Sequence, residues 1–198
     1  MISRTTRLLL ATAALALGVG VSSPATALDG YEDRERIFGG VGLGGGGAAL
    51  QLERGGDTSI EQATLVPGVH ATALLGGGIT QNVLAAAEMN WWFRNVSKGS
   101  DRKWATHHFS VLPVVNVFVA GGLHVDAGGG LAYTAYVGDH PAADLPHQEL
   151  GFAAEGGLGY EFWLNGTLAA GADIGYAHHF YPNGSFDTVS GAFTLRWY

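Results

Sequence analysis

Cysteine is absent from the 198 residues, which excludes the disulfide framework that stabilises many small secreted domains. Charged residues are also scarce, at 14% of the chain, whereas ordinary globular chains contain about 25%. A surface that contacts only water normally carries more charge than this. Stability must therefore come from backbone pairing and packing, and part of the surface is expected to face something other than water.

Long apolar runs are missing after residue 27, and nothing there approaches the roughly 20 residues of a transmembrane helix. The N-terminus is different. Arg4 and Arg7 form a basic start, an apolar stretch too short for a comfortable span follows, and Ala-Thr-Ala at 25–27 fits a cleavage site. We expect residues 1–27 to be a secretory signal peptide. The alternative is the amphipathic N-terminus of a cytosolic protein.

Positive charge is also in short supply. Residues 1–27 contain two of the 10 basic residues and none of the 17 acidic ones, so the mature chain has a net charge of −9. A nucleic-acid partner would need a basic surface and is not expected.

His107-His108 and His178-His179 do not predict a metal site, because adjacent side chains on a strand point to opposite faces. We expect no metal and no cofactor.

Glycine is abundant, at 32 residues, or about twice its average usage. After a short charged segment at 28–36, interpreted as a periplasmic lead-in, apolar and polar residues alternate along the rest of the chain. Alternation with a period of two indicates β-strands. Eight strand candidates are present, at 37–53, 66–79, 83–95, 107–120, 123–138, 149–163, 167–181 and 187–198.

The connections between these candidates alternate in length. Three are tight, at 80–82, 121–122 and 164–166. Four are longer and polar, and they lie at 54–65, 96–106, 139–148 and 182–186. Short periplasmic turns that alternate with longer external loops are typical of outer-membrane barrels. We therefore predict an all-β fold for 37–198, an eight-stranded antiparallel up-and-down transmembrane β-barrel.

The alternation gives each strand two different faces. One face is bulky and apolar, and the other is mostly Gly and Ala with a few polar groups. Small residues with sparse charges suit the narrow interior of an eight-stranded barrel, whereas a soluble lipocalin-like barrel would invert the two faces. We predict a hydrogen-bonded interior network rather than an open pore. Its members are His70, Glu88, Asn90, Arg94, Asn116, Asp126, Glu155, Glu161, Asp173 and Arg196.

The acidic groups of this network exceed its basic ones. Glu88, Glu155 and Asp173 are expected near mid-barrel, with Arg94 higher and Arg196 near the periplasmic rim. Burying unpaired charge is costly. We therefore expect a proton, a cation or water to compensate these carboxylates.

Aromatic residues on the apolar face are expected to form two girdles at the membrane interfaces. The predicted girdle residues are Trp91, Phe93, Phe109, Tyr133, Tyr160, Phe162, Tyr176, Phe180 and Trp197.

The first strand breaks its alternation in the glycine run 44–47, which predicts a β-bulge there. The alternative is a glycine-rich strand that packs under large neighbouring side chains.

The chain ends on an alternating apolar strand with a terminal aromatic, formed by Phe193, Leu195, Trp197 and Tyr198. With the strand pattern of the whole mature chain, this ending resembles small eight-stranded outer-membrane proteins of the OmpA and OmpX type. The resemblance implies that these four residues are the assembly signal read by the barrel-assembly machinery. It further implies a monomer in the outer membrane, in contact with lipid and lipopolysaccharide.

Several roles fit such a barrel. We favour a structural role in the envelope or a surface interaction. The locally basic loop 96–106 suits contact with lipopolysaccharide phosphates, although an ordinary solvated loop is the favoured interpretation of this segment. A narrow channel or carrier for small solutes is the alternative, although eight strands leave little lumen. His108-Phe109-Ser110 matches the minimal His-x-Ser element of lipid A deacylases. The alternation turns His108 and Ser110 inward, away from lipid, so we expect no enzyme.

Overall fold

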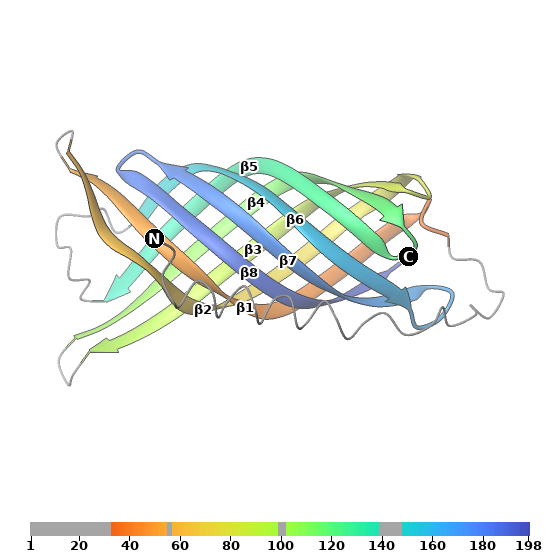
Figure 1. The fold of residues 1–198 in the computed structure, drawn as a ribbon, viewed down its shortest axis with the longest axis horizontal. Coiled ribbons are helices and arrows are strands. Elements are labelled where there is room, and N and C mark those ends of the chain that lie inside the picture. Colours follow the sequence, from red (N-terminus) through yellow and green to blue (C-terminus); the bar gives the residue numbers. More distant parts are fainter. Residues whose placement is uncertain (1–32, 55–56, 99–101, 139–147) are drawn as a thin grey trace, which may run out of the picture. The chain divides into compact units, whose positions relative to one another are not determined.

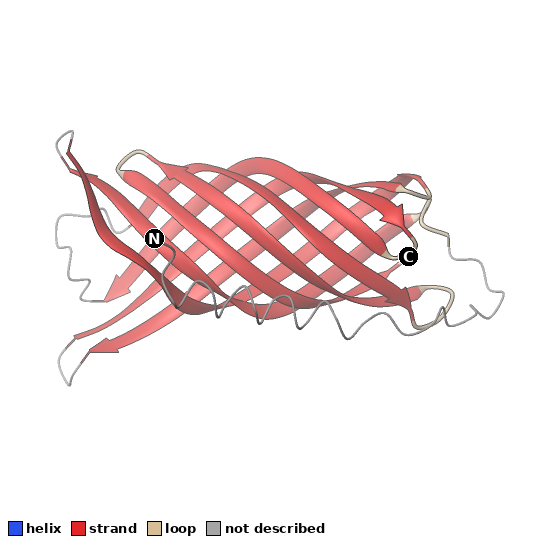
Figure 2. Ribbon diagram, in the orientation of Figure 1, coloured by secondary structure: helices blue, strands red, loops and turns tan. Residues whose placement is uncertain are grey.

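The computed structural model describes residues 33–54, 57–98, 102–138 and 148–198. The described chain forms eight strands: β1 (Ile37–Arg54), β2 (Asp57–Thr80), β3 (Val83–Lys98), β4 (Arg102–Ala120), β5 (Leu123–Gly138), β6 (Gln148–Trp163), β7 (Leu168–Tyr181) and β8 (Gly184–Trp197). Figure 2 shows strands and loops throughout this part of the chain. No helix in it is long and apolar enough to cross a membrane. The predicted signal peptide and residues 28–32 of the lead-in lie outside the described residues.

The strands pair in chain order, and β8 closes the sheet by pairing with β1 (Figure 1). Every neighbouring pair is antiparallel. Closure pairs each strand with two neighbours along the barrel wall and satisfies the backbone N–H and C=O groups there, while the part of β2 before Val69 pairs with β1 alone. The predicted all-β, eight-stranded antiparallel barrel is thereby confirmed.

The two ends of the barrel differ. We call the end with the lead-in and the C-terminus the terminal end. It also carries the turns β2–β3, β4–β5 and β6–β7, while the opposite loop end carries the other four connections. At the terminal end, Gly121 has a φ of +55° in the β4–β5 turn. A side chain is disfavoured in that conformation, so glycine makes this short turn possible.

Three of the four predicted long loops are shorter than expected. β2 begins at Asp57, β3 continues to Lys98 and β4 starts at Arg102, so most of 54–65 and 96–106 is strand. The loop predicted at 182–186 is reduced to Pro182 and Asn183. Polar sequences can extend a hairpin because its backbone groups pair across the two strands whatever the side chains are. The loop predicted at 139–148 lies almost entirely outside the described residues.

The predicted bulge in the glycine run 44–47 is wrong. The register between β1 and β2 is regular through Ala48, and its shifts lie between Ala48 and Leu52. The glycines are needed for close packing instead, since a Cβ on Gly44 would lie only 1.8 Å from the carbonyl oxygen of Gly191 on β8. The alternative interpretation of a packed glycine-rich strand therefore describes this segment.

The barrel interior is packed, and much of it is apolar. A buried cluster of large side chains includes Phe38, Leu74, Leu84, Leu112, Val114 and Phe118. A narrow lumen has to be filled like any protein core, and hydrophobic residues fill it without requiring hydrogen bonds. The predicted polar network therefore shares the interior with an apolar cluster that the prediction did not include.

Candidate functional site

A buried ionic cluster closes the terminal end. Nε of Arg34 lies 2.8 Å from Oε1 of Glu161, and the two side chains are 10% and 2% exposed. Arg196 approaches the other carboxylate oxygen at 3.5 Å, and the Tyr198 hydroxyl donates to it at 2.9 Å. The guanidinium carbon of Arg34 also lies 3.9 Å from the ring centre of Phe118. We call Arg34, Glu161, Arg196 and Tyr198 the terminal cluster.

The lead-in delivers Arg34 to this position through its own hydrogen bonds. The Arg34 amide donates to Oε1 of Gln81 in the β2–β3 turn, and the Gln81 amide group donates to Asp33. Asp33 also accepts from the Glu35 amide and from Arg36. These donors, the Glu35 amide above all, lower the pKa of the exposed Asp33 carboxyl. The Gly78 amide donates to the Arg36 carbonyl at 3.0 Å, so the lead-in is attached to the barrel end on both sides of Arg34.

Arg34 lies in the segment interpreted as a periplasmic lead-in, and the predicted interior network does not include it. A single arginine in a charged segment carries no signal of burial, because the partner Glu161 lies 127 residues away. The alternation does place Glu161 on an inward face, and an inward carboxylate needs a partner. That requirement is the only indication of the pair that the sequence gives.

A second ionic group lies deeper in the barrel. His124 Nε2 lies 3.0 Å from Oδ1 of Asp173, and Arg196 lies 3.9 Å from its other oxygen. A Cβ at Gly159 would overlap Asp173 and His124. The small residue therefore makes room for the pair, as expected for a narrow barrel. His124 is missing from the predicted network although it shares the inward parity of Asp126.

An interior cavity of about 80 Å³ lies beyond this group. Glu88 accepts from Thr72 at 3.0 Å, and Glu155 accepts from Asn90 at 2.9 Å. His70 is bonded to Asn90 at 3.2 Å. Eight of the ten predicted network residues line this one cavity: they are His70, Glu88, Asn90, Asn116, Asp126, Glu155, Asp173 and Arg196.

The two remaining network residues lie apart from the cavity. Glu161 belongs to the terminal cluster. Arg94 is half-buried on β3 and makes no ion pair with the part of the chain whose side chains are described.

An aromatic layer covers the loop side of the cavity. The rings of His108 and Phe186 stack with centres 3.5 Å apart, and Trp92 packs edge-on against Phe186. Trp92, His108 and Phe186 are all less than 5% exposed. His179 and Tyr181 also stack on each other beside them. The cavity therefore lies between an ionic closure and an aromatic one.

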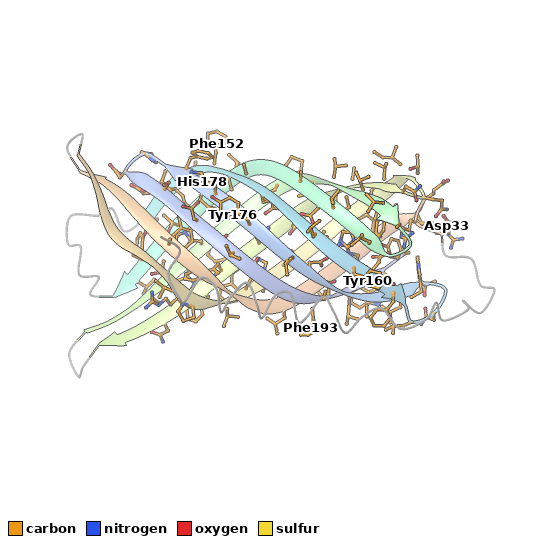
Figure 3. The ribbon with its side chains drawn as sticks, viewed as in Figure 1. Asp33, Phe152, Tyr160, Tyr176, His178 and Phe193 are labelled. Atoms are coloured by element: carbon orange, nitrogen blue, oxygen red, sulfur yellow. The ribbon has the colours of Figure 1, made fainter. Side chains whose placement is uncertain are left out.

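The outer wall carries the aromatic residues predicted for the girdles. Trp91, Phe109 and Tyr133 form one row, because the registers of β3, β4 and β5 pair them directly. Tyr160, Tyr176 and Phe193 likewise lie on the wall in Figure 3, with Phe152 near the loop end. Phe93 is half-buried and packs on Trp91. Phe162, Phe180 and Trp197 are exposed.

One carboxylate does face outward, although the apolar face was expected to contain none. Asp187 on β8 is paired with His178 on β7 at 2.6 Å, and it accepts a hydrogen bond from Tyr176 at 2.5 Å (Figure 3 labels the two partners). The two hydrogen bonds satisfy this carboxylate locally. This cluster lies toward the loop end of the barrel.

The four C-terminal residues divide between the two faces. Phe193, Leu195 and Trp197 point outward, and Phe193 is 80% exposed. Tyr198 does not continue this outer row, because its ring stacks on Phe38 and its hydroxyl bonds Glu161. Their role as an assembly signal stays a prediction.

The His-x-Ser element lies inside the barrel. His108 and Ser110 are 2% and 3% exposed, while Phe109 between them faces outward. The side-chain partner of His108 is the Tyr181 hydroxyl at 3.4 Å, and Ser110 makes no hydrogen bond to His108 among the described residues. A nucleophile needs an adjacent base that a third group orients. Among the described residues, no such arrangement is assembled at this element.

Comparisons with known proteins agree with the architecture. No family model matches the chain, and no curated protein matches it by sequence. Solved structures do match: the attachment invasion locus protein Ail of Yersinia pestis has a TM-score of 0.57 at 9% identity, covering 82% of this chain and 99% of that one. Neisserial surface protein A has a TM-score of 0.51 at 11% identity, with coverages of 81% and 96%.

The chain has the fold of these small barrels. At such low identity the likeness concerns the backbone alone. Ail has also been crystallised with the heparin analogue sucrose octasulfate.

Proposed function

We propose that this chain is an integral outer-membrane β-barrel with a structural or surface-interaction role. The observation that carries the proposal is the chemistry of the outer wall. Leu43, Leu75, Met89, Val111 and Leu131 are each more than half exposed. Monomeric soluble proteins rarely expose apolar patches larger than a few hundred Å², whereas hydrocarbon is the natural environment of such a wall.

The scarcity of outward charge supports the same orientation. Among the outward strand residues whose side chains are described, Asp187 is the one carboxylate, and it is paired. The ionic groups gather inside instead, around Glu161 and Asp173. A soluble barrel would need the reverse arrangement.

The two closures favour a structural or surface role over a channel. A solute would have to displace the Arg34–Glu161 pair at one end and the His108–Phe186 stack at the other. The surface that remains for interactions is the loop end, where the β3–β4 hairpin carries Lys98 and Arg102. Contact of this hairpin with lipopolysaccharide phosphates is part of the proposal.

Refolding of the mature chain from urea tests the membrane assignment. Lipid vesicles should yield a folded, protease-resistant barrel that floats with the vesicles, because the apolar wall requires hydrocarbon. The same dilution into buffer without lipid or detergent should yield aggregate. A monodisperse folded barrel in plain buffer would overturn the proposal.

A further inference from the structure

The interior cavity carries an excess of negative charge. Its walls include Glu88, Asp126, Glu155 and Asp173 but, as a cation, only Arg196 among the described residues. With neutral histidines the formal charge is −3. Adding the Arg34–Glu161 pair of the terminal cluster leaves this balance unchanged. Uncompensated charge in a narrow space away from bulk water is costly.

Deeply buried polar atoms point to a guest in the same space. Nδ2 of Asn116 and Nε2 of His108 have no hydrogen-bond partner among the described residues, and these side chains are 1% and 2% exposed. Both residues line the cavity, as do Trp92 and His70, which also carry an unpartnered nitrogen. Buried polar groups are normally hydrogen-bonded. These atoms therefore favour a guest that brings acceptors and donors, as water does.

The size of the cavity limits the guest. A volume of about 80 Å³ accommodates roughly five water molecules or a small ion with part of its water. A bulky organic cation does not fit. No three His, Asp or Glu side chains in the described part of the chain converge closely enough to coordinate a metal directly. Contact with the carboxylates must then run through water.

We propose that this cavity is a binding site for a small hydrated cation. Glu88 and Glu155 contribute compensating charge from β3 and β6, and a hydrogen bond from Thr72 or Asn90 already orients each of them. Asp126 and Asp173 extend the negative field toward the terminal end. Water bound to the ion can donate to Nε2 of His108, and a further water in the same cavity can accept from the Asn116 amide group. The site rests on the interior geometry and is independent of what surrounds the barrel.

Stability measurements in salts of small cations and in a salt of a large cation test this site. The mature chain is refolded in a neutral detergent with sodium, magnesium or tetrapropylammonium chloride at equal ionic strength and pH 7.5. Refolding in each salt lets the cation reach the interior before the strands close around it. A small cation at ten times its Kd should raise the folded-to-unfolded ratio roughly elevenfold over tetrapropylammonium, which is too large to enter.

The isosteric variant Glu88→Gln/Glu155→Gln should lose this salt difference, because it removes two charges and keeps two oxygen acceptors. Glu155→Gln alone should reduce the difference, and this single variant replaces the double variant in the test if the double variant does not fold. Glu35→Gln, an exposed carboxylate outside the barrel, is the matched control and should retain the difference. Equal stability of the parent chain in all three salts would overturn the proposal, as would an equal salt difference in the double variant. Failure of the vesicle experiment would leave these outcomes unaffected.

Discussion

At the scale of single residues, Arg34 is the side chain with the greatest structural consequence. It brings a positive charge to Glu161, stacks on Phe118 and ties the lead-in to the barrel. Glu161 also bonds Arg196 and Tyr198, so its carboxylate is held from three sides. The terminal end depends on a partner that lies before the first strand.

Arg34→Ala should destabilise the barrel by about 3 kcal/mol, because it leaves the buried Glu161 carboxylate short of a partner. The measurement is the free energy of unfolding in urea, followed by tryptophan fluorescence in vesicles. Arg36→Ala is the control: its pair with Asp33 is more than half exposed on the arginine side and should cost less than about 1 kcal/mol. Equal effects of the two substitutions would contradict the buried pair.

At the scale of elements, β1 approaches β8 so closely at Gly44 that no side chain fits there. Gly44→Ala should cost about 1–3 kcal/mol, because the added methyl meets the Gly191 carbonyl on a fixed neighbouring strand. The neighbouring Gly45 faces outward with 3.4 Å to its nearest atom, so Gly45→Ala should be close to neutral. Urea midpoints of the two variants check this, and similar values would show that β1 can shift.

The outward faces of the strands give an element-scale test of their surroundings. Leu131, near the middle of β5, is 54% exposed. Leu131→Arg should destabilise the vesicle-bound barrel by about 2–4 kcal/mol, as expected for an arginine near the bilayer midplane. Gln148→Arg, at the loop end of β6, should cost at most about 1 kcal/mol. If both are neutral in urea titrations, water surrounds β5.

The strand pattern was predictable at this scale to within a few residues for β3, β5, β6 and β7. Alternation is local, and a bulky apolar face next to a small polar one is visible in any six residues. The starts of β2 and β4 were not predictable, because the polar segments of these strands at the loop end carry no apolar face. The register shift near Leu50 was predicted at the wrong place, in the glycine run 44–47. Its position depends on the length of β2, and the sequence of β1 does not contain that information.

At the scale of the whole molecule, the barrel combines an apolar exterior with a chamber closed at both ends. Planar bilayers should therefore show no reproducible unitary currents from the parent chain. Arg34→Ala should remain non-conducting as well, because the stack of His108 on Phe186 still blocks the lumen. Regular current steps from the parent chain would favour the channel, and steps from Arg34→Ala alone would make Arg34 the sole closure.

The sequence by itself determined the eight strands, their two faces and the inward position of Glu88, Glu155 and Asp173, because a period of two assigns each side chain to a side. Only the tertiary structure decided which inward groups meet. Barrel closure brings residues from distant strands into one lumen, and the lead-in folds back into its end. The Arg34–Glu161 pair and the cavity between the two closures arise there, since contacts between such distant residues leave no periodic trace in the chain.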